Sequence, residues 1–355
     1  MIVRTLELRD YRSYPRLKLP LEPGIVLAVG PNGAGKTNLL ESLHLAAQGF
    51  SPRTRSDAQL IRFGENGARV AVEGDHGGSP VSVEVTLRLG EAKRARLNGA
   101  PLRAAEELRT RLPALVFTPD RLAIVKGGPA VRRAYFDRSL ARLLPARAAA
   151  STDYAAALAQ RNGALRRVAG GYSSREALDP WTGRIAELGT ELVVARRELI
   201  ELLTPAFVDT AEELRLGGAT LRYEGEAPSR EELERRLEQD LARGSTGLGP
   251  HLHDVAITAD ERDLRAFGSQ GEQRLAVLAL LLAEADLLAE RGPAGPLLLL
   301  DDVLSELDPD RRAILAEHLR RKGAQAFLTA TTDTALPGSP DELVRVQPGQ
   351  ARRAE

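Results

Sequence analysis

The chain has 355 residues, of which 43% are hydrophobic and 28% charged, with a net charge of +0 and no cysteine. This length predicts about two domains with a sizeable core, and the lack of cysteine excludes disulfides, thiolate metal sites and cysteine nucleophiles. The N-terminus has no leader pattern, and the longest apolar run, 275–283, is far shorter than the roughly 20 residues of a membrane span. We expect a cytoplasmic globular protein.

A glycine-rich loop between a strand and a helix is the first segment with a recognisable chemistry. An apolar strand is expected at 25–29 and a helix at 38–47, whose leucines share one side. The loop between them, GPNGAGKT, fits G-x-x-x-x-G-K-[ST], in which amides cradle phosphates. Lys36 is expected to reach the β- and γ-phosphates and Thr37 to ligate Mg²⁺. The expected nucleotide contacts are Gly30, Asn32, Gly33, Ala34, Gly35, Lys36, Thr37 and Asn38.

Strands follow the loop, and helices follow the strands. Residues 69–73 and 81–89 alternate in hydrophobicity, which predicts two strands. Residues 148–169 are rich in Ala, Leu and Arg, and apolar positions step by three and four between Pro180 and Pro205. We expect an antiparallel helical pair, too short for a long coiled coil.

A basic segment lies between these strands and helices. Residues 93–147 contain thirteen Lys or Arg side chains against four acidic ones, a net charge of +9, so the remainder carries −9. This asymmetry suggests a basic face, on which Arg132, Arg133 and Arg138 can share part of one helical side. If this face follows a phosphate backbone, these three arginines are the expected DNA contacts. Two alternatives are a solvated helix face and a structural brace formed by Arg132 and Arg133.

Two histidines and an aspartate, His251, His253 and Asp254, lie within four residues. No distant ligand completes a tetrahedral metal site with them, so packing of a turn is the favoured interpretation.

A second anion site is expected at the start of the helix in 266–288. Ser269 and Gly271 open this helix, where free amides and the helix dipole favour an anion. An ordinary helix cap is the alternative.

Four leucines followed by Asp301 and Asp302 predict a buried parallel strand with carboxylates at its C-terminal end. Asp301 is expected to hold Mg²⁺, and Asp302 to polarise the attacking water. An acidic turn without a ligand is the alternative. Asp301 lies 265 positions after Lys36, which indicates a large insertion.

The order of phosphate loop, Ser269 helix, acidic strand and SELD at 305–308 resembles the head of an ABC ATPase. Four further segments resemble the RecF family of recombination mediators, whose heads are similar to those of SMC proteins. They are LRDYRSYPRLKL, LVFTPDRLAIVKGGPAVRRAYFD, GLGPHLHDVAI and FGSQGEQR. The resemblance covers nearly the whole chain and implies an α/β, SMC-like ATPase head, at 1–100 and 215–355, with a mainly helical domain at 101–214.

The resemblance also implies a function. RecF-like proteins bind ATP and Mg²⁺, dimerise on ATP, hydrolyse it slowly, and bind double-stranded DNA, including junctions with single strands. They act in DNA replication, recombination and the SOS response, and they help RecO and RecR to load RecA at gaps. By the same resemblance Ser269 and Gly271 contact the nucleotide of the partner subunit, and Arg12 lies near the adenine.

Three positions depart from related patterns. Glu272 stands where RecF signatures often have Gln, and Asp302 replaces the Glu of most ABC heads, which fits slow hydrolysis. Thr332 and Asp333 occupy the place of the switch histidine of transporters. Gln48 follows the phosphate loop too closely to be a Q-loop residue.

The main alternative is the ATPase subunit of a membrane transporter. That class predicts a standard Q-loop, a switch histidine and an apolar dock for a membrane partner, and none is evident in the sequence. An SMC-like cohesion protein would need helices several times longer than the pair before Pro205.

Overall fold

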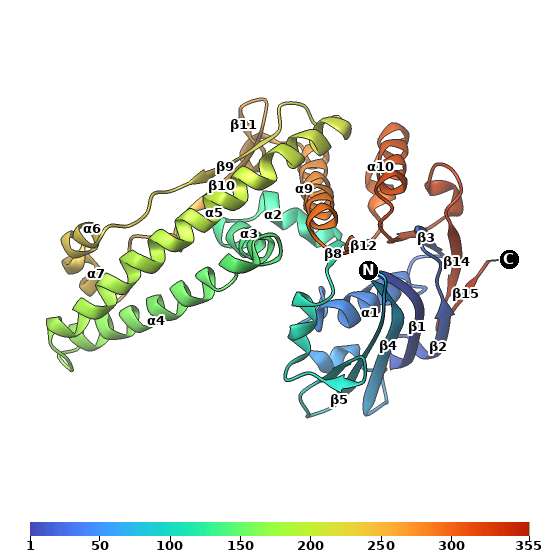
Figure 1. The fold of residues 1–355 in the computed structure, drawn as a ribbon, viewed down its shortest axis with the longest axis horizontal. Coiled ribbons are helices and arrows are strands. Elements are labelled where there is room, and N and C mark those ends of the chain that lie inside the picture. The colour runs from blue at the N-terminus through green and yellow to red at the C-terminus, as the bar shows by residue number, and fades with distance from the viewer. Residues whose placement is uncertain (355) are drawn as a thin grey trace. The chain divides into compact units, whose positions relative to one another are not determined.

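The computed structural model describes residues 1–354, which form two compact units (Figure 1). The first unit contains Met1–Arg121, Glu213–Arg215 and Leu278–Glu355, and the second contains Leu122–Glu212 and Leu216–Val277. These boundaries differ from the expected 101–214. Strand pairing assigns 114–117 to the first unit, and a small sheet formed by 220–263 belongs to the second unit.

A largely parallel sheet forms the nucleotide-binding half of the first unit. Its strand order is β15-β14-β3-β13-β12-β8, and only β15 is antiparallel to its neighbour. The central strands are continuous apolar runs because both faces of the sheet are buried. The strands are β3 (Ile25–Val29), β8 (Ala114–Phe117), β12 (Leu297–Leu300), β13 (Ala326–Ala330), β14 (Glu342–Gln347) and β15 (Gln350–Arg353).

An antiparallel sheet forms the other half, in the order β2-β1-β4-β5-β6-β7. Its apolar side chains alternate with polar ones, so that one face joins the core and the other meets water. Its strands are β1 (Ile2–Tyr11), β2 (Tyr14–Pro20), β4 (Gly67–His76), β5 (Ser79–Arg88), β6 (Arg94–Leu97) and β7 (Ala100–Pro101).

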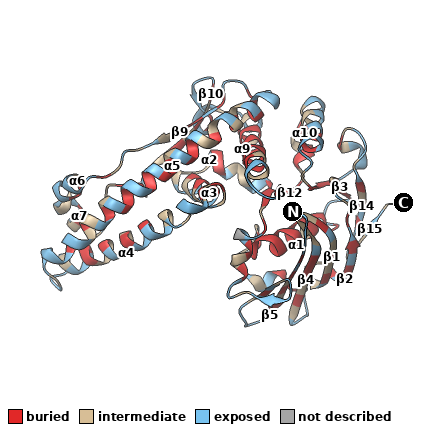
Figure 2. Cartoon of the chain, in the orientation of Figure 1, coloured by how far each residue is buried: buried red, intermediate tan, exposed pale blue. Residues whose placement is uncertain are grey.

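Helix α1 (Lys36–Gln48) packs against strands of both sheets, and eleven of its thirteen residues are buried (Figure 2). It begins at Lys36, two residues before the expected start. Helix α10 (Pro309–Lys322) follows β12, and helix α9 (Gln270–Arg291) runs from the second unit into the first.

Helices dominate the second unit. They are α2 (Ala123–Lys126), α3 (Pro129–Leu143), α4 (Ala150–Ala169), α5 (Asp179–Glu213), α6 (Arg230–Arg235), α7 (Leu237–Arg243) and α8 (Leu264–Phe267). A three-stranded sheet accompanies them, in the order β11-β10-β9, with β9 (Thr220–Glu224), β10 (Asp254–Ala259) and β11 (Arg262–Asp263). Short 3₁₀ turns are η1 (Asp57–Leu60), η2 (Ala105–Thr110), η3 (Pro119–Leu122), η4 (Pro145–Arg147), η5 (Arg175–Leu178), η6 (Val303–Glu306) and η7 (Asp333–Ala335).

The expected helical pair corresponds to α4 and α5, but α5 continues through Pro205. Proline removes one backbone hydrogen bond from a helix interior. Phe207 and Ala211, beyond Pro205, are fully buried, so their packing offsets that loss. The two helices are also joined through Arg161 of α4, which is fully buried and bonds Asp240 of α7 at 2.8 Å and Thr182 of α5 at 3.5 Å.

Within residues 1–354, the helices are all too short or too polar to cross a membrane.

Candidate nucleotide-binding site

The phosphate loop leaves the C-terminal end of β3 and enters α1, as the sequence predicts. Gly30 and Gly35 are required by their surroundings. A Cβ at Gly30 would lie 2.3 Å from the carbonyl oxygen of Val346, and Gly35 has a φ of +108° with Tyr14 Oη 2.8 Å from its would-be Cβ. Tyr14 also donates a hydrogen bond to the Gly35 carbonyl at 3.0 Å, which ties β2 to the loop.

Lys36 curls back over the loop. Its Nζ donates to the carbonyl oxygens of Gly30 at 2.7 Å and Pro31 at 3.0 Å, and the side chain is buried. Burial lowers the pKa of Lys36, while the carboxylates of Asp302 and Asp301 oppose that shift. The ammonium therefore lies at the loop, facing the acidic end of β12.

Thr37, in α1, contacts Asp301, directly after β12, although the two residues are far apart in the sequence. Thr37 Oγ1 donates to Asp301 Oδ1 at 3.1 Å, and Thr329 Oγ1, in β13, donates to the same oxygen at 2.7 Å. Burial raises the pKa of Asp301, and these two hydrogen bonds oppose the shift. A hydroxyl beside a carboxylate is a ligand set that suits Mg²⁺, so these residues fit that ion.

Asp302 lies next to this pair in an unusual backbone conformation. Its φ is +52°, in the left-handed region that few residues other than glycine adopt. Its N–H donates to Thr329 Oγ1 at 2.9 Å, and Ser305 Oγ donates to its carbonyl at 2.9 Å. Thr329 thus holds both aspartates, a role that the sequence did not reveal.

Arg12 is held by Glu41, whose role was not predicted from the sequence. Arg12 Nε and Nη2 each donate to one Glu41 carboxylate oxygen at 2.8 Å, and Ser51 Oγ donates to the same carboxylate at 2.6 Å. Glu41 is fully buried, five residues after Lys36 in α1. The predicted helix did not reveal this role, because Glu41 lies on the side opposite Leu39 and Leu43. It is buried because α1 packs against strands of both sheets, and a buried acid needs partners.

Ser269 and Gly271 lie at the start of α9, in the second unit, and both are exposed. Ser269 Oγ accepts from the Glu272 N–H at 3.2 Å, and Glu272 Oε2 accepts from the Ser269 N–H at 2.7 Å. This reciprocal pair is a capping box. It gives a physical reason for the acid at 272 and matches the alternative interpretation of Ser269 as a cap.

The predicted DNA face needs a correction at Arg132. This side chain is 5% exposed and forms an ion pair with Asp254 through Nη2 and Nε. It also donates to the carbonyls of Val125 and Gly127. Arg133 is half-buried and donates to the His253 carbonyl at 2.5 Å. Both arginines therefore brace α3 inside the second unit, because their guanidinium groups are committed to protein acceptors. Arg138 is exposed on α3.

The two histidines of the turn are also occupied by protein partners. His251 Nδ1 is 2.8 Å from Tyr154 Oη, and His253 Nδ1 is 2.7 Å from Tyr223 Oη. Burial lowers the pKa of His253 to about 4. No cluster of three or more metal-ligating side chains exists in the described part of the chain.

Comparisons with known proteins place the chain in a family. Residues 2–354 match the family model described as the RecF/RecN/SMC N terminal domain. The chain is 35% identical to the DNA replication and repair protein RecF of Heliobacterium modesticaldum, with 100% of both chains covered. The chain belongs to the RecF family.

Solved structures agree with this RecF-family assignment. The recombination mediator protein RecF with ATP, of the RecFOR pathway, is similar at a TM-score of 0.87 and 27% identity, over 99% of this chain and 97% of that one. An Smc head bound to a domain of ScpA shares the fold at a TM-score of 0.62 and 18% identity, over 100% and 97%. The predicted fold class, an SMC-like ATPase head with a helical domain and no long coiled coil, is confirmed. The transporter alternative finds no support in these matches.

Proposed function

We propose that this RecF-family chain is an ATP-dependent DNA-binding protein of recombinational repair. The observation that carries the proposal is the meeting of Thr37 and Asp301, at 3.1 Å, beside the phosphate loop. The ATP of the similar RecF structure and the repair function named for the curated relative support the same conclusion. We propose that it acts in the cytoplasm, where the DNA of its bacterial relatives lies.

The proposed chemistry uses the residues of the loop and the acidic strand. When ATP binds, the Lys36 ammonium gives up its hydrogen bonds to the two loop carbonyls and donates to β- and γ-phosphate oxygens instead. The backbone amides of Gly33, Gly35 and neighbouring residues donate to the phosphates as well. Mg²⁺, held by Thr37 and Asp301, would neutralise phosphate charge. Asp302 orients the attacking water toward the γ-phosphate. Its side chain is shorter than the Glu of most ABC heads, which fits slow ATP hydrolysis. Arg12, fixed by Glu41, contacts the adenine side of the nucleotide.

The proposed switch is a dimer that forms on ATP. Ser269 and Gly271 are exposed at the start of α9, where they can reach the nucleotide of the partner subunit. Two composite sites then close around two ATP molecules, and DNA binding follows from this closed state. DNA stimulates the slow hydrolysis that reopens the dimer.

We also propose roles for the two units and for the partners. The first unit is the ATPase head, and the second is the helical lobe. The pathway of the similar RecF structure supports RecR and RecO as partners and RecA loading at gaps as the outcome.

Sedimentation velocity with and without ATP, and with and without duplex DNA, tests the function. We expect a monomer without ATP, a dimer with ATP, and a faster-sedimenting complex only when both ligands are present. A chain that does not bind DNA either with or without ATP would contradict the proposal. A chain that binds DNA equally well without ATP would contradict the proposed switch.

A further inference from the structure

A basic groove lies where the edge strands of the two sheets meet in the first unit. Strand β2 is the edge of the antiparallel sheet, β15 is the edge of the other sheet, and the two strands are in contact. Four cations line the groove, namely Arg16 and Lys18 from β2, Arg345 from β14 and Arg352 from β15. The other lining residues are uncharged, so no carboxylate neutralises the groove from within.

The strand register places like charges directly opposite each other at this groove. Arg345 faces Arg352 across the β14–β15 hairpin, and Arg16 faces Arg9 across the β1–β2 pair. Like charges at opposed positions destabilise a sheet. One of these pairs lies within the groove, and the other joins a groove residue to Arg9 beside it. Neither pair stabilises its sheet, and an anionic ligand accounts for them better.

Two of the four cations have exposed acidic partners outside the groove. Lys18 Nζ lies 2.9 Å from Glu7 Oε1, and Arg345 Nη2 lies 3.2 Å from Asp333 Oδ2. The Lys18 side chain is 74% exposed and that of Arg345 is 54% exposed, so water and salt weaken these pairs. Arg16 and Arg352 have no ion pair within residues 1–354.

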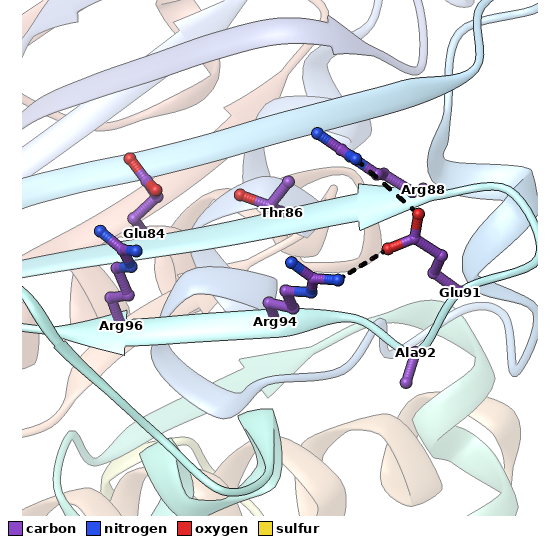
Figure 3. A pocket seen from close by; sticks show the side chains of 7 residues that line it. All are labelled: Glu84, Thr86, Arg88, Glu91, Ala92, Arg94 and Arg96. Carbon is purple, nitrogen blue, oxygen red and sulfur yellow. Dashed lines mark hydrogen bonds and ion pairs between the residues drawn. The ribbon is translucent and has the colours of Figure 1, made fainter.

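A second arginine-rich hollow in the same unit, called the acid-containing hollow below, has two glutamates against three arginines (Figure 3). It lies on β5 and β6, and its arginines are accompanied by Glu84 and Glu91. Arg94 Nη2 is 3.0 Å from Glu91 Oε2, and Arg88 Nη1 is 3.8 Å from Glu91 Oε1. Arginine content alone does not distinguish the two places, but the carboxylates do.

We propose that the basic groove formed by Arg16, Lys18, Arg345 and Arg352 binds the phosphate backbone of duplex DNA. The inference rests on the proposed function, and it supplies a DNA-contacting surface in the first unit that Arg132 does not provide. Arginine suits phosphate because its planar fork donates two hydrogen bonds. Arg16 and Lys18 are two residues apart on one strand, about 6.7 Å, so they can contact different phosphates.

Salt-dependent DNA binding by the double variant Arg16→Gln/Arg352→Gln tests the proposal, with ATP, Mg²⁺ and a short mixed-sequence duplex. Losing two phosphate contacts should reduce the slope of log Kobs against log salt by about two, at ~0.9 per contact. Because electrostatic contributions vanish near molar salt, affinity at physiological salt should fall about thirtyfold. All duplex sequences should be affected alike.

The matched control is Arg88→Gln/Arg94→Gln, which removes the same charge from the acid-containing hollow and should leave the slope unchanged. Arg16→Lys/Arg352→Lys keeps the charge and should retain the slope. Equal slopes for the groove variant and the control would overturn the inference while the wild type still bound DNA. Charged side chains on edge strands also deter aggregation, so a groove variant that only aggregates, with an unchanged slope in its soluble fraction, would overturn it too. Failure of the wild type to bind DNA would instead remove the proposed function itself.

Discussion

Asp301 and Asp302 are adjacent in the chain but have different surroundings. Asp301 is buried and accepts hydrogen bonds from Thr37 and Thr329, which suits a fixed ligand for a metal ion. Asp302 is half-buried in a left-handed backbone conformation that the Thr329 hydroxyl supports. Such conformations cluster at functional sites, where they aim a side chain.

Replacing Asp302 by Asn should therefore separate nucleotide binding from hydrolysis. The variant should bind ATP and Mg²⁺ normally but release phosphate about a hundredfold more slowly, because a water-orienting carboxylate is lost while the phosphate loop is intact. It should accumulate the ATP-bound dimer, which sedimentation and phosphate-release assays will detect. A monomeric Asp302→Asn in ATP would contradict the assignment. An Asp301→Asn variant that proves milder than Asp302→Asn, with ATP and Mg²⁺ binding unchanged, would contradict it as well.

At the scale of secondary-structure elements, Arg132 joins α3 to β10. Its ion pair with Asp254 and its two backbone acceptors are removed together in Arg132→Ala. Leaving Asp254 without its partner should cost about 3–5 kcal/mol in the free energy of unfolding.

Denaturant unfolding measures this loss, and Arg138→Ala, at an exposed position of the same helix, is the control. The control should change the stability by less than about 1 kcal/mol. An Arg132→Ala protein with wild-type stability and a reduced salt slope for DNA would restore the original DNA interpretation.

His318 connects α10 to α9 and to the end of α5 within the first unit. Its Nδ1 lies 3.0 Å from Glu213 Oε2 and its Nε2 lies 3.4 Å from Asp286 Oδ1. Burial alone would lower the pKa of His318, but the hydrogen bonds to Asp286 and Glu213 outweigh it and raise the pKa. A raised pKa in the folded state gives stability below the unfolded value of about 6.5, and this stability is lost as pH rises through the folded value.

Through the contribution of His318, the protein should consequently melt at a lower temperature near about pH 8.5 than near about pH 6. His318→Gln should reduce this difference, because glutamine does not titrate. His251→Gln is a suitable comparison, since burial lowers the pKa of His251 and its contribution has the opposite sign. An unchanged pH dependence in His318→Gln would show that the histidine is neutral in this range.

At the scale of the whole molecule, the proposed dimer depends on Ser269 acting on the nucleotide of the partner. Ser269→Arg should abolish ATP-induced dimerisation while leaving ATP binding by the monomer intact. The bulky cation obstructs the facing site but lies outside the phosphate loop of its own chain. Sedimentation and nucleotide titration measure the two effects separately. Loss of monomer ATP binding as severe as that of Lys36→Ala would show that Ser269 does not act on the partner.

Local patterns predicted the first unit better than the second. The phosphate loop, and β12 with its two aspartates, can each be recognised from a short local sequence pattern. The net charge of the basic segment can be read from the sequence. It does not indicate that Arg132 pairs with Asp254, 122 residues away. The end of α5 was expected at Pro205 because local propensity says nothing of the buried Phe207 beyond it.

Helix α1 packs against strands of both sheets, so its backbone amides are shielded from solvent by the surrounding domain. Amides in such a helix open to solvent only when much of the domain unfolds. Deuterium uptake by α1 should therefore be among the slowest in the first unit, with or without nucleotide. The phosphate loop would then be preformed, so that nucleotide exchange proceeds on a rigid platform without a refolding step.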